Sequence, residues 1–249
     1  MSRHRLILIE GVPGSGKTTL AAGVQQLLAA RGVPTRLVIE GDLNHPADYE
    51  MVAHYTAHDF EALLARFPGE RALLEAGVEA IGDDRFIPFR LLEQRASPPL
   101  SVGLLDELAR HDVYETPLPA TYCRLAIDRW ARFVAKAQAA PEVVILESCF
   151  LQNPLTVLLA KHNVAPEEAA EHLRRLAETV APLDPLLVYL WQPDTRATLE
   201  HAARERPADW LNFVVGYVTR QAWGQANGAR GFDGMVAFYE MRKALELYI

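Results

Sequence analysis

The 249-residue sequence has few cysteines, no excess of basic residues and no long uninterrupted apolar run. Its two cysteines, Cys123 and Cys149, lie far apart and have no cysteine or histidine neighbour at ligand spacing, which argues against a disulfide framework and against a zinc site. The formal net charge of −7 provides no broad basic field for a nucleic-acid backbone or an anionic membrane. We therefore expect neither a nucleic-acid polymer nor a membrane as a partner.

The sequence has no segment that suits export or membrane insertion. The apolar run at residues 6–9 ends at Glu10, too soon for the hydrophobic part of a signal peptide. The most apolar later window, residues 143–159, is interrupted by Glu147 and Pro154 and is therefore not expected to span a bilayer. These patterns predict a cytoplasmic protein.

The clearest motif that is present is the loop at residues 11–18, which has the pattern Gly-x-x-x-x-Gly-Lys-Thr. Its glycines allow successive backbone N–H groups to point inward around a phosphate. Lys17 supplies a positive charge for the β- and γ-phosphates, and the Thr18 hydroxyl is suited to ligate Mg²⁺. The loop thus predicts ATP and Mg²⁺ as ligands. The residues expected to contact the nucleotide are Gly11, Val12, Pro13, Gly14, Ser15, Gly16, Lys17, Thr18 and Thr19.

The surroundings of the loop predict an α/β fold. Strands are expected at residues 5–9, 35–39, 143–146 and 186–191, and the first of them, a short continuous apolar run, suits a central strand buried on both faces. Helical periodicity follows the loop over residues 17–30. Strands that alternate with helices in this way predict a three-layer α/β/α sandwich with a mainly parallel sheet.

The remaining sequence is predicted to be largely helical and to belong to a single domain over residues 1–249. Helices are expected at residues 59–66, 71–81, 102–111, 118–139 and 209–249, the last with an interruption near residues 224–234. Residues 44–119 are interpreted as a helical insertion that faces the substrate, and residues 200–230 as a lid.

The phosphate loop and residues 186–206 together resemble the P-loop kinases of nucleotides, nucleosides and small molecules, most closely the thymidylate-kinase-like group. In the second stretch a strand leads through residues 192–194 into a helix that carries Arg204 and Arg206 at its end. The resemblance implies a P-loop NTPase fold of the nucleotide-kinase type. Residues 40–49 match no nucleotide-kinase signature, and residues 238–249 are predicted to be helical where such kinases end in a strand.

Carboxylates at the C-terminal ends of the predicted strands are the first candidates for catalysis, because ligands of open α/β sheets bind there. Asp42 follows the second strand, where kinases that this sequence resembles place the carboxylate that accepts the proton of the acceptor hydroxyl. Asp42 is therefore predicted to bind the substrate and to act with Lys17 in catalysis. The alternative is that Asp42 caps a turn next to Asn44. Glu40 is the second candidate for the catalytic role.

Two further strand ends carry carboxylates. Glu147 ends an aliphatic strand in the Walker B pattern, so that together with Thr18 it is predicted to hold Mg²⁺ directly or through water. The alternative for Glu147 is a structural, hydrogen-bonded carboxylate. Asp194 is expected instead at the start of a helix, where a carboxylate complements the helix dipole.

Four arginines are candidates for binding phosphate. Arg204 and Arg206 fall where related kinases have a mobile lid, whose arginines close over the transferring phosphate, and they are predicted to be catalytic. The alternative is a solvated end of a helix. Arg124 and Arg129 are predicted to bind an anionic substrate, as an arginine in thymidylate-kinase-like proteins does. A surface ion pair with a neighbouring carboxylate such as Asp128 is the alternative for these two.

Together these residues predict an ATP-dependent kinase that moves the γ-phosphate to a small-molecule acceptor. Asp42 favours a hydroxyl of a metabolite, nucleoside or antibiotic as the acceptor. The alternatives are a nucleoside monophosphate kinase, which would use an anion site such as Arg129, and a regulatory nucleotide-binding ATPase switch. The Asn-Lys-x-Asp motif with which switch GTPases read the base is missing. The sequence is compatible with a homodimer.

Overall fold

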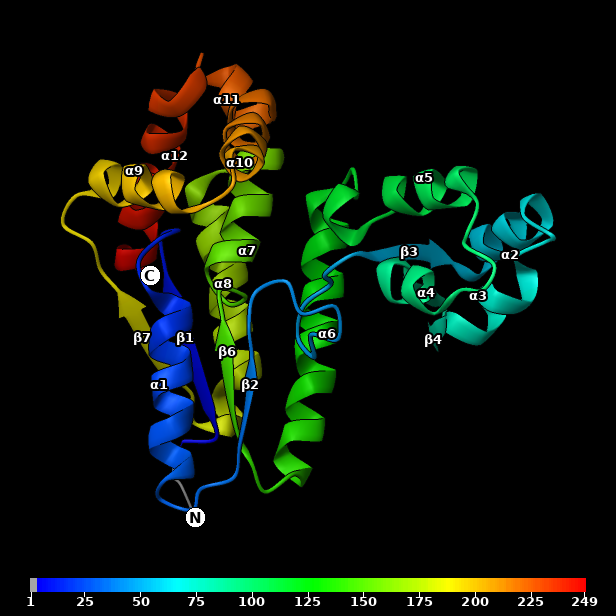
Figure 1. Cartoon of the computed structure of the whole chain (residues 1–249), viewed down its shortest axis with the longest axis horizontal. Helices are drawn as coiled ribbons and strands as arrows, with labels where there is room; N and C mark the ends of the chain where they lie inside the picture. The colour runs from blue at the N-terminus through cyan, green and yellow to red at the C-terminus, as the bar shows by residue number, and fades with distance from the viewer. Residues whose placement is uncertain (1–3) are drawn as a thin grey trace. The chain divides into compact units, whose positions relative to one another are not determined.

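The computed structural model describes residues 4–249 of the chain, which divide into two units (Figure 1). The first unit comprises the residues up to Glu40 together with Cys123–Ile249, and the second unit comprises Gly41–Tyr122. The second unit thus contains the whole of the segment 44–119 that was predicted to be an insertion. Residues 1–3, with which the predicted domain begins, lie outside the described residues.

The first unit is built on a parallel sheet of four strands in the order β2-β6-β1-β7. These strands are β1 (Leu6–Gly11), β2 (Thr35–Val38), β6 (Val143–Glu147) and β7 (Leu186–Leu190). The four predicted strands and their parallel arrangement are confirmed. Since parallel strands end at the same edge of a sheet, the register that pairs Ile9 with Glu147 brings the end of β6 next to the start of the phosphate loop.

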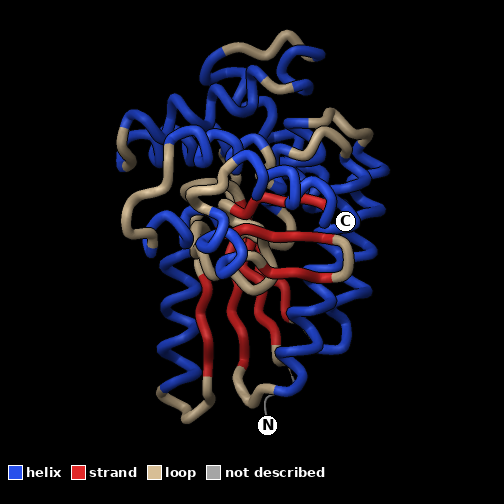
Figure 2. The backbone as a smooth tube through the Cα atoms, turned by 90° about the vertical axis from the view of Figure 1, so that its right-hand side faces the viewer, coloured by secondary structure: helices blue, strands red, loops and turns tan. Residues whose placement is uncertain are grey.

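Burial of both faces explains why the two central segments form strands, whereas the outer strands β2 and β7 are only partly buried. Every residue of β1 and β6 is buried, and helices lie on either side of the four strands (Figure 2). On one face Ile9 and Ile145 pack with Ala21 of α1 (Lys17–Ala29). Because burying one such aliphatic side chain contributes about 2 kcal/mol, a run of aliphatic residues is most stable as a central strand covered on both faces.

Helices make up most of the rest of the first unit, and those predicted at residues 17–30, 118–139 and 209–249 are confirmed. After β2 the helical elements are α6 (Pro119–Ala139, whose first turn belongs to the second unit), α7 (Gln152–Leu155), the π-helix η2 (Thr156–Lys161), α8 (Pro166–Val180), the 3-10 helix η3 (Ala181–Leu183), α9 (Thr195–Glu205), α10 (Ala208–Arg220), α11 (Ala222–Ala226) and α12 (Gly231–Tyr248). Within residues 4–249 no helix is both long and apolar enough to cross a membrane.

The second unit has an antiparallel sheet of three strands in the order β3-β5-β4, with helices around it. Its elements are β3 (Val52–Thr56), α2 (Ala57–Arg66), α3 (Arg71–Gly77), β4 (Glu79–Ile81), β5 (Asp84–Pro88), α4 (Phe89–Arg95), α5 (Val102–Arg110) and the 3-10 helix η1 (Val113–Glu115). The core of this unit includes Phe60, Leu64, Ile87 and Leu104. The helices predicted at 59–66 and 102–111 are confirmed.

The antiparallel sheet was not predicted, and the helix expected at residues 71–81 is wrong beyond Gly77. The chain leaves the helix there and forms a hairpin in which Ile81 pairs with Asp84 across a two-residue turn. Gly82 occupies this turn with a φ of 58°, in the left-handed region that glycine adopts without strain. A Gly-Asp pair between short strands is a known hairpin signal, but β4 has only three residues, too few to show alternation.

Candidate phosphate-binding site

The phosphate loop leaves the end of β1 and runs into the first turn of α1. Gly11, Gly14 and Gly16 have φ values of 147°, 82° and 91°, which residues with a Cβ atom rarely adopt. Gly16 is also the N-cap of α1, and no side chain caps this helix. Its first N–H groups are therefore free of a side-chain cap, and the positive end of the helix dipole favours an anion at the same place.

Two neighbouring elements lie directly against the loop. A Cβ atom added at Gly11 would lie 2.9 Å from the carbonyl oxygen of Leu190, the last residue of β7. A Cβ atom added at Gly14 would lie 2.8 Å from Cβ of Ala202 in α9. The loop is thus confined by contacts that only glycine permits at these two positions.

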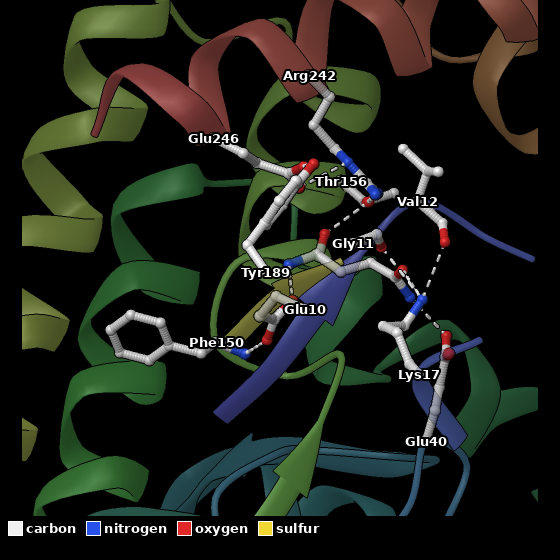
Figure 3. A network of polar contacts seen from close by, with 11 residues as sticks. Glu10, Gly11, Val12, Lys17, Glu40, Phe150, Thr156, Tyr189, Arg242 and Glu246 are labelled. Carbon is white, nitrogen blue, oxygen red and sulfur yellow. Dashed lines mark hydrogen bonds and ion pairs between the residues drawn. The ribbon is translucent and has the colours of Figure 1, made fainter. Parts of the chain in front are cut away.

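Lys17 is buried against the inner side of the loop, with only 5% of its surface exposed. Its Nζ donates to the carbonyl oxygens of Gly11 at 3.1 Å and Val12 at 3.2 Å (Figure 3), and to Oε1 of Gln152 at 3.2 Å. Burial lowers the pKa of Lys17 below its ordinary value, although the charge of Glu40 opposes this shift. The ammonium group is therefore held by neutral oxygens, which the charged oxygens of a phosphate can replace.

The Thr18 hydroxyl donates to Oε1 of Glu147 at 2.8 Å, which joins the loop to the end of β6. The other carboxylate oxygen, Oε2, is buried and has no hydrogen-bond partner among the described residues. Burial raises the pKa of Glu147, while the bond from Thr18 and the charges of Lys17 and Arg206 lower it. The Thr18 hydroxyl and the unpartnered Oε2 of Glu147 are oxygen ligands of the kind that Mg²⁺ binds. A cation there would offset the cost of burying the carboxylate charge of Glu147.

Thr18 and Glu147 would supply only part of a metal's coordination shell. Within residues 4–249 no group of three or more His, Cys, Asp or Glu side chains is assembled to hold a metal ion. Mg²⁺ commonly binds to proteins through one or two side chains and takes its other ligands from substrate phosphates and water. The predicted pair of ligands therefore suits Mg²⁺ bound together with a nucleotide.

Glu10 was not predicted to belong to the site. It is fully buried at the end of β1, where Oε1 accepts the N–H of Phe150 at 2.8 Å (Figure 3) and Oε2 accepts the N–H of Gln152 at 3.0 Å. Burial raises the pKa of Glu10 to about 7, although the backbone N–H groups act in the opposite direction. Glu10 thus ties the segment after β6 to the strand that precedes the phosphate loop.

The chain turns sharply where β6 ends. Ser148 has a φ of 65°, and its N–H donates to the carbonyl oxygen of Ile9 at 3.1 Å. Its hydroxyl is buried and has no hydrogen-bond partner in the described part of the chain. A serine in the left-handed region costs about 1 kcal/mol or more, so the contacts around Ser148 must hold its backbone there.

Glu40 and Asp42, the two candidates for the base, have different surroundings. Glu40 lies in the first unit, where its Oε1 accepts a hydrogen bond from Nε2 of Gln152 at 2.8 Å. Asp42 lies in the second unit, where its Oδ1 accepts the N–H of Asn44 at 2.8 Å and its carbonyl oxygen accepts the N–H of His45 at 2.9 Å. Asp42 therefore caps a turn, which is the alternative that the sequence left open.

The helix α9, which packs on the loop, contains Arg204 and is flanked by two further predicted residues, Asp194 and Arg206. Asp194 caps its N-terminus, since Oδ1 accepts the N–H of Ala197 at 2.9 Å, and this prediction is confirmed. Arg204 is exposed in its last turn. The guanidinium group of Arg206 lies 4.5 Å from the centre of the Trp210 ring in α10, a cation–π contact. The catalytic role of Arg204 and Arg206 stays a prediction.

The two predicted substrate arginines are both on α6. Arg124 is half exposed and forms an ion pair with Asp128 one turn later, with Nη1 and Oδ2 3.4 Å apart. This contact is the surface ion pair that the sequence gave as an alternative, and at such a distance in solvent it contributes little stability. Arg129 has a buried Nε. Binding of an anionic substrate by either side chain stays a prediction.

No protein-family model and no curated protein sequence matches the chain. Its function must therefore be inferred from the loop and the groups around it.

We expect Gly14→Ala to disrupt the loop. The new methyl group would meet α9, and its backbone would be held at a φ of 82°, so the variant should lose about 1–3 kcal/mol of stability together with nucleotide binding. Thermal unfolding and calorimetry with Mg·ATP measure both. Gly23→Ala in α1 is the matched control: nothing lies within 4 Å of its added Cβ atom, and helix propensity should raise its stability by up to about 1 kcal/mol. Equal behaviour of the two variants would contradict the confinement of the loop.

We also expect Glu10 to make stability depend on pH. Its pKa of about 7 in the folded protein lies above the ordinary 4.5, so its contribution is fully present below about pH 4.5 and is lost as the pH rises through 7. The loss amounts to about 3 kcal/mol. Denaturant unfolding should therefore show a smaller decline with pH for Glu10→Gln than for the wild type.

The control for this measurement is His172, whose contribution has the opposite sign. Burial lowers its pKa to about 4 from 6.5, so its contribution is present above pH 6.5 and is lost as the pH falls toward 4. His172→Gln should change the slope in the sense opposite to Glu10→Gln. Parallel pH profiles for wild type and Glu10→Gln would show that Glu10 does not titrate in this range.

Proposed function

We propose that this protein is an ATP-dependent phosphotransferase that moves the γ-phosphate of ATP to a hydroxyl group of a small molecule. The observation that carries the proposal is the joining of three groups at one loop. A buried lysine, Lys17, lies against a glycine loop at the start of a helix, and the next residue, Thr18, is hydrogen-bonded to the strand-end carboxylate of Glu147. These groups supply what phosphoryl transfer uses: backbone N–H donors, a cation and a place for a metal.

The sheet order supports a P-loop NTPase fold of the nucleotide-kinase type, arranged as a three-layer sandwich. The loop follows β1, which lies between β6 and β7, and β6 ends in Glu147. Ligands of parallel sheets bind at the C-terminal edge, next to strands whose connections run in opposite directions. Here the connection from β1 leads to β2 at one side of the sheet, and β7 lies at the other.

The loop and Glu147 would divide the binding of phosphates and metal between them. The N–H groups of the loop and of the first turn of α1 would bind the phosphates, and Lys17 would exchange loop carbonyl oxygens for oxygens of the β- and γ-phosphates. Thr18 and Glu147 would hold Mg²⁺, which when bound neutralises charge on the phosphates. The unpaired Oε2 of Glu147 is the observation that supports the metal site.

Glu40 fits the role of the acceptor base better than Asp42 does. Its carboxylate is linked to Lys17 through a single residue, Gln152. Asp42 instead caps a turn within the second unit. The roles of Asp42 and of residues 44–119 in acceptor binding stay predictions.

A turnover assay tests this function. Release of ADP from Mg·ATP is measured with a panel of hydroxylated metabolites, nucleosides and antibiotics, and one class should stimulate it strongly. Lys17→Met should lower the stimulated rate by about 100-fold or more, since it removes the only side-chain cation of the loop. Lys136→Met, a substitution of an exposed lysine on α6, should leave the rate unchanged. Stimulation by proteins alone would instead indicate a regulatory switch.

A second experiment concerns the metal. Thr18→Val keeps the shape of the side chain but removes its hydroxyl, so the magnesium dependence of ATP binding should weaken by about 10-fold or more. Thr18→Ser keeps the hydroxyl and should retain the dependence. Magnesium titrations at fixed ATP measure this, and identical curves for the two variants would argue against Thr18 as a metal ligand.

A further inference from the structure

Gln152 lies between two charged side chains next to the phosphate loop. Its Oε1 accepts a hydrogen bond from Nζ of Lys17 at 3.2 Å, and its Nε2 donates to Oε1 of Glu40 at 2.8 Å. Only 7% of its surface is exposed. A carboxamide has one accepting end and one donating end, so its orientation is fixed by a cation on one side and a carboxylate on the other.

The backbone of Gln152 is held as firmly as its side chain. Its N–H donates to Oε2 of Glu10 at 3.0 Å, and its carbonyl oxygen accepts from Oγ1 of Thr156 at 2.6 Å. Gln152 begins α7, and at Thr156 this helix continues as the π-helix η2. A π-helix is rare and often marks a functional site. The helix that continues into this π-helical segment thus begins at Gln152, the residue that contacts Lys17.

A buried ion pair from α12 reaches Thr156. Arg242 is fully buried and donates from Nη1 to Oγ1 of Thr156 at 2.9 Å, and its Nε lies 2.9 Å from Oε1 of Glu246 (Figure 3). The Tyr189 hydroxyl at the end of β7 donates to Oε2 of Glu246 at 2.6 Å. Contacts therefore run without a break from α12 and β7 through Thr156 to Gln152.

Stability alone does not account for this pair. Burying two charges costs several kcal/mol each, and apolar residues of similar volume are often as stabilising or more so. Nε and Nη2 of Arg242 and Oε1 of Glu246 also have no hydrogen-bond partner among the described residues, so Nε and Oε1 form an ion pair at 2.9 Å without hydrogen-bond geometry, and the polar groups of the pair are not fully satisfied. What the pair does provide is a defined orientation, because the guanidinium group, paired in charge with Glu246, donates from Nη1 to the hydroxyl of Thr156.

We propose that Gln152 is a positioning residue for Lys17, held in place by Thr156 and by the Arg242–Glu246 pair. The inference rests on the proposed function. When a nucleotide enters, Lys17 must give up the carbonyl oxygens of the loop, whereas the contact with Gln152 is made from outside the loop and persists. This contact holds the ammonium group where it meets the outermost phosphate. Gln152 thereby raises the affinity for a nucleoside triphosphate more than the affinity for a diphosphate.

The test measures binding of Mg·ADP and of the magnesium complex of a non-hydrolysable imido analogue of ATP to the full chain by calorimetry. Gln152→Ala and Thr156→Val should lower the ratio of triphosphate to diphosphate affinity by about 10-fold, the usual effect of losing an outer positioning contact. Both variants remove buried hydrogen bonds, and Thr156→Val leaves an N–H of the buried Arg242 without its acceptor, so their melting temperatures should fall by a few degrees while the proteins stay folded. Thr156→Ser keeps the hydroxyl that joins Arg242 to Gln152 and should retain the wild-type ratio.

The outcomes separate this inference from the proposed function. If the wild type binds both nucleotides and Gln152→Ala leaves the ratio unchanged, or if Val and Ser at position 156 give the same ratio, the positioning role is wrong while the proposed function stands. A parallel loss of both affinities with a large fall in melting temperature indicates a structural role only and also overturns the inference. Failure of the folded wild type to bind either nucleotide removes the proposed function and this inference together.

Discussion

The site depends on a loop that has no room for a side chain at two of its glycines, Gly11 and Gly14. Because Gly11 and Gly14 lack a Cβ atom, the end of β7 and the helix α9 approach the loop backbone directly. This confinement keeps the loop in a conformation with left-handed residues and leaves Lys17 buried against it. A loop fixed in this way before the ligand arrives loses little conformational entropy on binding, which is what preorganisation of a phosphate site requires.

The carboxylates around the loop are a reason to expect that a phosphate ligand would bind together with a cation. Glu10, Glu40 and Glu147 lie at the same edge of the sheet as Lys17, and burial raises the pKa of both Glu10 and Glu147. A polyphosphate alone would add negative charge beside these carboxylates. A divalent cation at Glu147 would offset the repulsion between this carboxylate and the phosphates, which is a physical reason to expect that nucleotide and Mg²⁺ bind together.

The features that could be predicted from the sequence are those that a short segment determines by itself. The four parallel strands are local apolar runs, and the cap at Asp194 is a local pattern. Glu10 and Gln152 were missed because their contacts arise between segments 142 residues apart, when β1 and β6 pair in the sheet. The buried Arg242–Glu246 pair was missed because an arginine and a glutamate one turn apart usually lie on a solvated helix face. The hairpin of β4 and β5 was missed because its strands are short.

The most direct test of the central claim is calorimetric titration of the folded, unmodified protein with ATP in the presence and absence of Mg²⁺. The account predicts saturable binding that strengthens with Mg²⁺ and disappears when the ammonium group of Lys17 is removed. Titration without heat of binding, or binding that is indifferent both to Mg²⁺ and to the loss of Lys17, would contradict the account.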